Sequence, residues 1–326
     1  MKLQATSYQL QVFRRTPAGA EAFNLQLSTF HALLAFSLIE VLLTVTLLSL
    51  IILALMNVFS STQQAFRASV TQTDVLEGGR AVMQMIADDL RELTHSDKPP
   101  VGSPTNVSSS GIFAPVNFST TANSYNYSPL IQSLPASAGQ RINLLNYFFI
   151  LKYDSEHNKW IGIGYIVDTA SATALYPLYR FYAEADKNAN PLALFSGFNN
   201  AVLTAQWTNM SHLMDGVVHL VVRAHDPNGG WINNFSTNVA NTFYASPVTT
   251  PAGPFSWGEG QFYMFSNTIP AAVELQLGII EDRTLQRAES LPTYNSRTNY
   301  LEKQSGHVHI FRQLVIIPNV DPSAYQ

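Results

Sequence analysis

A single acidic residue, Glu40, interrupts an otherwise apolar stretch of the chain, residues 36–56, which reads FSLIEVLLTVTLLSLIILALM. As a helix, this stretch would be about 31 Å long, close to the thickness of the hydrocarbon core of a bilayer. A carboxylate in that core costs about 2.5–3.5 kcal/mol, so we expect Glu40 to have a partner of opposite charge. The chemistry that this pattern predicts is the pairing of charges within a membrane.

Two short clusters contain residue types that bind metals. His307 and His309 would lie on one face of a strand, and His225 and Asp226, beside a turn, could supply further ligands. We expect surface histidines here, because His307 and His309 alone are only half of a metal site. The oxygen-rich segment Asp226-Pro227-Asn228-Gly229 is interpreted as a turn, since it lacks the alternating acidic residues of a calcium loop.

The remaining candidates for acid–base chemistry are pairs of adjacent carboxylates, Asp88-Asp89 and Glu281-Asp282. Neighbours in sequence point to different sides of a helix or strand, so neither pair is arranged for catalysis. We expect Asp88 and Asp89 to solvate the exposed face of a helix. The chain contains no G-x-S-x-G, H-E-x-x-H or P-loop motif. We therefore predict a protein without enzymatic activity, with no catalytic residue, no metal ligand and no cofactor.

Composition narrows the possible classes of protein. The 326 residues have a formal net charge of −4, so there is no basic footprint for nucleic acid, and we predict none as a partner. Only 12% of residues are charged, which the apolar stretch and several Ser/Thr/Asn-rich segments explain. The chain has no cysteine, which excludes disulfides, thiolate nucleophiles and cysteine metal sites.

Basic residues precede the apolar stretch, and the next one lies eleven residues past Met56, the end of the stretch. Lys2, Arg14 and Arg15 lie in residues 1–35, and the next basic residue after the stretch is Arg67. This asymmetry predicts a single membrane span with the N-terminus in the cytoplasm and the C-terminal bulk outside. Residues 1–35 are interpreted as a leader, and residues 36–56 as an anchor that survives processing because the small residues precede it.

Residues 57–96 are predicted to be a mostly helical, amphipathic region. Val82, Ile86, Leu90 and Leu93 recur at helical spacing, and we expect Gly78-Gly79 to break or kink the helix before them. Pro99-Pro100 is expected to end it.

The C-terminal part is predicted to be rich in β-structure. Residues 97–142 are interpreted as a loop-rich segment with one short strand near residues 111–116, and residues 228–260 as a second loop. From residue 143 to residue 326 we expect an antiparallel β domain, because segments rich in aromatic and β-branched residues recur. The predicted strands are 147–153, 160–167, 174–182, 202–207, 217–223, 262–265, 272–280 and 307–317. The fold class is therefore α+β, with a long N-terminal helix and a C-terminal antiparallel sheet.

The string Ala35-Phe36-Ser37-Leu38-Ile39-Glu40-Val41-Leu42-Leu43-Thr44, which opens the apolar stretch, resembles the type IV prepilin signature. The resemblance implies that a prepilin peptidase cuts between Ala35 and Phe36 and methylates the new amine of Phe36. It also implies a role in assembly for Glu40, whose carboxylate would meet the amine of a neighbouring subunit and so set the register. The sequence departs from the family pattern at two points. Ala35 stands where the family usually has glycine, and the basic residue nearest to the predicted cut, Arg15, lies twenty residues before it, whereas typical leaders place Lys or Arg close to the cut.

Two further segments resemble larger members of this family. The run 80–91, RAVMQMIADDLR, and the segment 269–275, IPAAVEL, are similar to parts of the J-type minor pseudopilins of type II secretion and the W-type minor pilins. They also resemble the large prepilin-type proteins of the Verru_Chthon cassette. The resemblance implies a pilin-like fold.

These observations together predict a minor pilin or pseudopilin. It would be a single-pass protein of the bacterial inner membrane, with its C-terminal domain in the periplasm, and would join or prime a type IV pilus or a type II secretion pseudopilus. Its expected partners are the prepilin peptidase and other pilins or pseudopilins, contacted through the N-terminal helix. The alternative is a membrane-anchored adhesin or carbohydrate-binding protein that uses loops 97–142 and 228–260. Its candidate contact residues are the aromatic side chains Trp207, Trp231, Trp257, Tyr125 and Tyr127.

Overall fold

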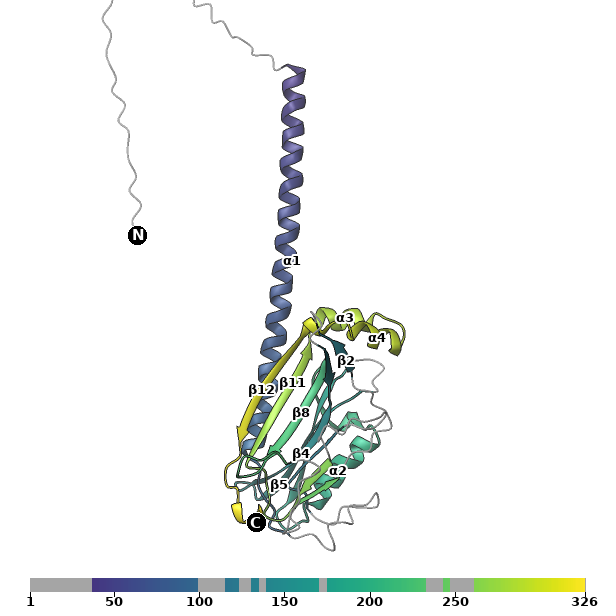
Figure 1. Ribbon diagram of the computed structural model, residues 1–326. Helices are drawn as coiled ribbons and strands as arrows, with labels where there is room; N and C mark the ends of the chain where they lie inside the picture. The colour runs from purple at the N-terminus through teal and green to yellow at the C-terminus, as the bar shows by residue number, and fades with distance from the viewer. Residues whose placement is uncertain are drawn as a thin grey trace, which may run out of the picture. The chain divides into compact units, whose positions relative to one another are not determined.

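The computed structural model describes residues 37–98, 115–122, 130–134, 139–169, 175–232, 243–246 and 261–325. The chain separates into two units, Met1–Ser61 and Thr62–Gln326. Within these residues the protein is α+β, with one long apolar N-terminal helix and antiparallel sheets, as the sequence predicts (Figure 1). All pairings between its named strands are antiparallel.

The first element is the helix α1, Leu38–Arg91. The expected break at Gly78-Gly79 is wrong, because α1 continues through both glycines and ends well before Pro99. Tertiary packing explains this result. A Cβ atom at Gly79 would lie 2.8 Å from Ile279 Cδ1 and even closer to the ring of Phe311, so the absence of a side chain allows the helix to approach these two residues. A Cβ atom at Gly78 would meet nothing within 4 Å.

Seven strands form the larger sheet, in the order β7-β6-β5-β4-β1-β10-β9. Their bounds are Phe118–Ala122 (β1), Asn146–Asp154 (β4), Lys159–Val167 (β5), Leu178–Asp186 (β6), Ser211–Met214 (β7), Phe243–Ser246 (β9) and Gln261–Met264 (β10). β4 shows why this sheet is stable, since both of its faces are buried. Successive side chains of a strand alternate, so Phe148 and Ile150 face one cluster of apolar side chains, and Phe149 and Leu151 face another.

Two smaller sheets complete the β-structure. One has the order β12-β11-β8, with β8 at Val217–His225, β11 at Ala272–Ile280 and β12 at Val308–Ile316. The other is a hairpin of β2, Leu130–Ser133, and β3, Gln140–Asn143. Strands β1 and β2 and most of β3 thus lie in the segment interpreted as loop-rich. Of the short strand expected near residues 111–116, residues 111–114 lie outside the described residues, and residues 115 and 116 are not in a strand.

Most of the strands predicted beyond residue 143 are confirmed, but one is wrong. Residues 202–207 were expected to be a strand, whereas α2, Leu192–Leu203, is a helix, followed by the short 3-10 helix η3, Trp207–Asn209. The helix forms because Leu194, Phe195, Phe198, Ala201 and Val202 recur with helical spacing, and all five are buried against one face of the larger sheet. The other helices are α3, Asp282–Glu289; α4, Tyr294–Leu301; η4, Ser305–His307; and η5, Pro322–Tyr325.

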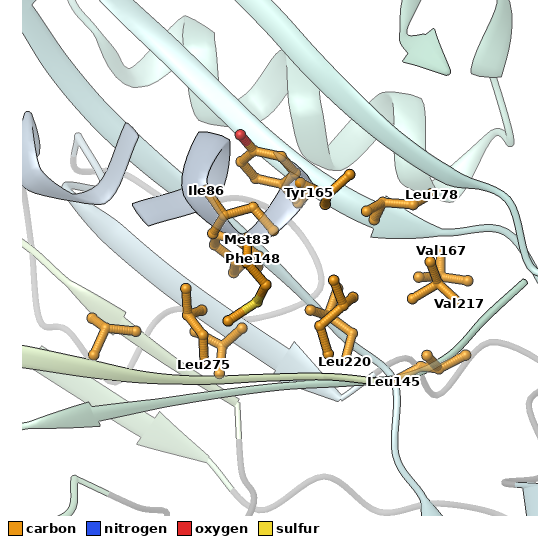
Figure 2. Close-up of a cluster of buried hydrophobic side chains, with 14 of the residues drawn as sticks. Met83, Ile86, Leu145, Phe148, Tyr165, Val167, Leu178, Val217, Leu220 and Leu275 are labelled. Atoms are coloured by element: carbon orange, nitrogen blue, oxygen red, sulfur yellow. The ribbon is translucent and has the colours of Figure 1, made fainter. Parts of the chain in front are cut away.

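The main core of residues 62–326 lies between α1 and the two larger sheets. The predicted helical stripe is confirmed, since Val82, Ile86, Leu90 and Leu93 are all buried. Figure 2 shows Met83 and Ile86 of α1 in the same cluster as Phe148 of the larger sheet and Leu275 of β11. Burying a side chain of this size contributes about 1.5–3 kcal/mol, so the C-terminal part of α1 belongs structurally to the β domain.

The two adjacent glycines of α1 provide a direct test of this packing. Gly78→Ala should raise the free energy of unfolding by about 1 kcal/mol, because the helix gains a better former in open space. Gly79→Ala should lower it by about 1–3 kcal/mol, because the new methyl group collides with Phe311 and Ile279. Urea unfolding of the full chain in detergent measures both changes, and equal effects of the two substitutions would contradict the described contact.

Candidate functional site

Glu40 lies in the first turn of α1, three residues after Ser37, which caps the helix. The backbone N–H of Glu40 donates to the carbonyl oxygen of Ser37 at 2.9 Å and to its Oγ at 3.3 Å. Ser37 and Glu40 have the spacing of a capping box, in which Ser precedes the helix and Glu occupies its third position. This signal is present in the sequence, and it explains why α1 starts at Leu38. It also places the carboxylate at the positive end of the helix dipole.

The apolar part of α1 is exposed on every side within its own unit. The large hydrophobic residues between Leu38 and Met56 have exposed fractions of 48–83%. Thr44, Thr46 and Ser49 satisfy their hydroxyl groups within the helix, because each donates to a backbone carbonyl at 2.8 Å. Such a helix suits an apolar medium, and α1 is long and apolar enough to cross a membrane. Glu40 is then the one ionisable side chain in the segment.

The other two residues of the predicted processing site are Ala35 and Phe36. Both lie outside the described residues, as does the predicted leader, residues 1–35. Their roles in cleavage and N-methylation stay predictions, and so does the role of Glu40 in assembly.

A second charged cluster, which the sequence analysis missed, ties α1 to the larger sheet. Asp89 was expected to be solvated, but its side chain is only 13% exposed and accepts two hydrogen bonds from Arg180 of β6, from Nε at 2.9 Å and from Nη2 at 3.0 Å. The hydroxyl of Tyr165 in β5 also donates to Asp89. The spacing contained the signal, because Asp89 lies three residues after Ile86 and seven after Val82, on the buried face of the helix.

The electrostatics of this cluster favour a charged, paired state. Burial alone would lower the pKa of Arg180, but the hydrogen bonds and the charge of Asp89 outweigh burial and raise that pKa. Burial raises the pKa of Tyr165 well above its usual range, and Asp89 raises it further, so the hydroxyl stays protonated and donates. Arg180 donates to both oxygens of the Asp89 carboxylate, and Tyr165 stacks on Phe148 with ring centroids 5.0 Å apart. We call Asp89, Arg180 and Tyr165 the lock, because together they fix α1 on the larger sheet.

The residues considered for metal binding are divided between the two ends of β11. His309 pairs with Ile279 and His225 pairs with Ala272, so seven residues of β11, about 23 Å, separate the two histidines. His225 and Asp226 therefore cannot complete a site with His307 and His309. Asp226 instead forms the predicted turn, where its Oδ1 accepts from the backbone N–H of Asn228 at 2.9 Å. Within the described ranges, no group of three or more His, Asp or Glu side chains could hold a metal ion.

The aromatic residues considered for ligand binding have internal contacts where they are described. Trp207 stacks on Tyr179 with ring centroids 5.6 Å apart, and the guanidinium of Arg223 lies 5.1 Å from the ring centroid of Trp231. Trp257, Tyr125 and Tyr127 lie outside the described residues. Carbohydrate binding through loops 97–142 and 228–260 stays an untested alternative.

Comparison with known proteins gives no relative: the chain matches no protein-family model, no curated protein and no solved structure.

Adjacent carboxylates provide a matched test of the lock. Asp89→Asn would leave Arg180 largely buried without a counter-charge and should lower the free energy of unfolding by about 2–4 kcal/mol. Asp88 forms an ion pair with Arg91 at 2.6 Å, in which both side chains are about half exposed, and accepts a hydrogen bond from Gln84 at 2.8 Å, so Asp88→Asn should cost about 0.5 kcal/mol or less. Thermal unfolding of the full chain in detergent compares the two variants, and a similar effect of both would show that the Asp89 pair does not lock the helix.

Proposed function

We propose that the protein is a minor pilin-like or pseudopilin-like subunit, anchored in the bacterial inner membrane by residues 36–56 before it joins a filament. Its C-terminal domain would lie in the periplasm. The observation that carries the proposal is the position of Glu40, which lies in the first turn of α1 and is the one carboxylate in the apolar part of this helix, Leu38 to Met56. A carboxylate is costly in lipid, and a cationic partner at the same depth offsets that cost.

The partner that fits this position is a free N-terminal amine one helical turn away in the chain. Cleavage between Ala35 and Phe36 would create that amine at the start of α1, four residues before Glu40. In a stack of parallel helices, the carboxylate of one subunit could then pair with the methylated amine of Phe36 in the next. Such a pair would favour one axial register, because any shift of about one turn leaves both charges unpaired in lipid.

The remainder of the described chain suits a structural subunit of this kind. The C-terminal part of α1 is held by its apolar stripe and by Asp89, so this part of the helix and the β domain form one structural unit. Phe66 and Val70, which lie between the anchor and the buried stripe, are exposed and offer an apolar surface to neighbouring helices. The J-type minor pseudopilins and the W-type minor pilins are the proposed subclasses, and the prepilin peptidase and sister subunits the proposed partners.

Substitutions of Glu40 test the proposal and separate it from helix capping. Glu40→Ala should insert into the membrane at least as well as the wild type, because a desolvation cost is removed. It should reduce incorporation into sheared filaments by tenfold or more, because the amine of the neighbouring subunit loses its counter-charge and a charge left unpaired in lipid costs about 2.5–3.5 kcal/mol. Incorporation is measured as the ratio of filament to membrane fraction in cells that carry the sister subunits.

Glu40→Gln provides the decisive control, because glutamine retains the capping-box pattern and removes only the charge. If charge pairing sets the register, Gln should fail as Ala does. Thr44→Ala, one turn further along the same helix, should assemble normally. Normal assembly of Glu40→Gln would exclude the charge-pairing role and leave helix capping as the function of this residue.

A further inference from the structure

The helices α3 and α4 lie at one end of the β domain (Figure 1). They border a polar cavity that the proposed function does not use. It has a volume of about 760 Å³, within the range of about 300–1,000 Å³ that is common for small-molecule sites. One wall is α3, which contributes Arg283 and Arg287, and other parts of the lining come from Gln72 of α1, Tyr300 of α4 and Gln304. All of these residues belong to the unit Thr62–Gln326.

The two arginines are neighbours on the surface of α3. They are four residues apart, and both line the cavity and are exposed. Neither forms an ion pair with any residue that the structure describes. Two like charges at this spacing destabilise a helix by about 0.2–0.5 kcal/mol.

The one carboxylate in the lining already has two partners. Glu281 accepts a hydrogen bond from His307 Nδ1 at 2.8 Å and another from His309 Nε2 at 3.1 Å. Burial alone would raise the pKa of Glu281, but these two imidazoles outweigh burial and lower it, so the carboxylate stays ionised and engaged. Among the described residues, the ion-pair partners of Glu281 are these two histidines and not Arg283 or Arg287.

The acidic residues near α3 line a different hollow. Asp74, Asp215, Asp282 and Glu289 border a second cavity of about 320 Å³, whose lining includes neither arginine. The lining of the larger cavity thus contains two guanidinium groups and one carboxylate, Glu281, whereas the smaller cavity is lined by four carboxylates and no arginine. Cations therefore outnumber anions in the lining of the larger cavity.

We propose that the cavity beside Arg283 and Arg287 binds a phosphate group. Guanidinium groups pair with phosphate oxygens through two parallel hydrogen bonds, and two of them on one helical turn can hold one phosphate from two sides. Gln72, Tyr300 and Gln304 add amide and hydroxyl donors for the remaining oxygens or for an attached alcohol. The phosphate can come from a soluble ion or from the headgroup of an anionic lipid.

Calorimetric titration of the full chain in a neutral detergent tests the proposal with two soluble probes. Inorganic phosphate represents the free ion, and glycerophosphoglycerol represents the headgroup of phosphatidylglycerol. We expect at least one probe to bind the wild type and Arg287→Gln to weaken that binding about tenfold, which corresponds to the loss of one charge-assisted contact. The double variant Arg283→Gln/Arg287→Gln should weaken it further.

Arg312→Gln is the matched control, since it removes one exposed arginine from β12, outside the lining of the cavity. It should bind as the wild type does. The double variant without ligand should unfold at the same temperature as the wild type or slightly above it, because a repulsion has been removed. Tighter binding of one probe assigns the source of the phosphate. Absence of binding by both probes, or equal binding by the wild type and the double variant, would overturn the proposal.

Discussion

Residues 38–91 form one helix, and the two parts of this helix have to satisfy different surroundings. From Leu38 to Met56 every side of the helix is apolar and exposed, and its hydroxyl groups bond to the helix backbone. From Val75 to Leu90 only one side is apolar, and that side is buried against the sheets. A helix of the first kind is stable where water is absent, and a helix of the second kind needs a domain to cover it. The placement of the β domain on α1 and the isolation of Glu40 both follow from this division.

The carboxylates in the two parts of α1 differ in where their counter-charge lies. Asp89 has its counter-charge within the domain. Arg180 donates to its two carboxylate oxygens from Nε and Nη2, so the pair fixes how the C-terminal part of α1 lies on the sheet. Glu40 lies at the start of α1 beside the capping residue Ser37, and the apolar stretch 36–56 contains no Lys or Arg. We propose that its counter-charge comes from another subunit. A charge that is paired within one molecule makes that molecule more rigid. A charge whose partner lies in a neighbouring subunit can instead specify how the subunits assemble.

Local patterns in the sequence predicted much of this fold. The helical recurrence of Val82, Ile86 and Leu90 and the alternation in β4 and β11 have clear periods, so the elements that they mark are confirmed. Gly79 was misjudged because helix propensity counts the missing side chain as a loss, whereas close approach of Phe311 makes its absence necessary. Asp89 was misjudged because its partner, Arg180, is ninety-one residues away, a pairing that no local pattern shows. The cavity beside α3 likewise depends on segments that are distant in sequence, so only the structure could bring Gln72 near Arg287.

The central claim is that Glu40 pairs with an amine that does not exist until the chain is cut. Mass spectrometry of the protein purified from membranes of its native host tests this claim most directly. The account predicts a mature chain that begins at N-methylated Phe36 and lacks residues 1–35. A chain that retains residues 1–35 would contradict it, because Glu40 would then have no such partner, and the protein would be better described as a membrane-anchored binding protein.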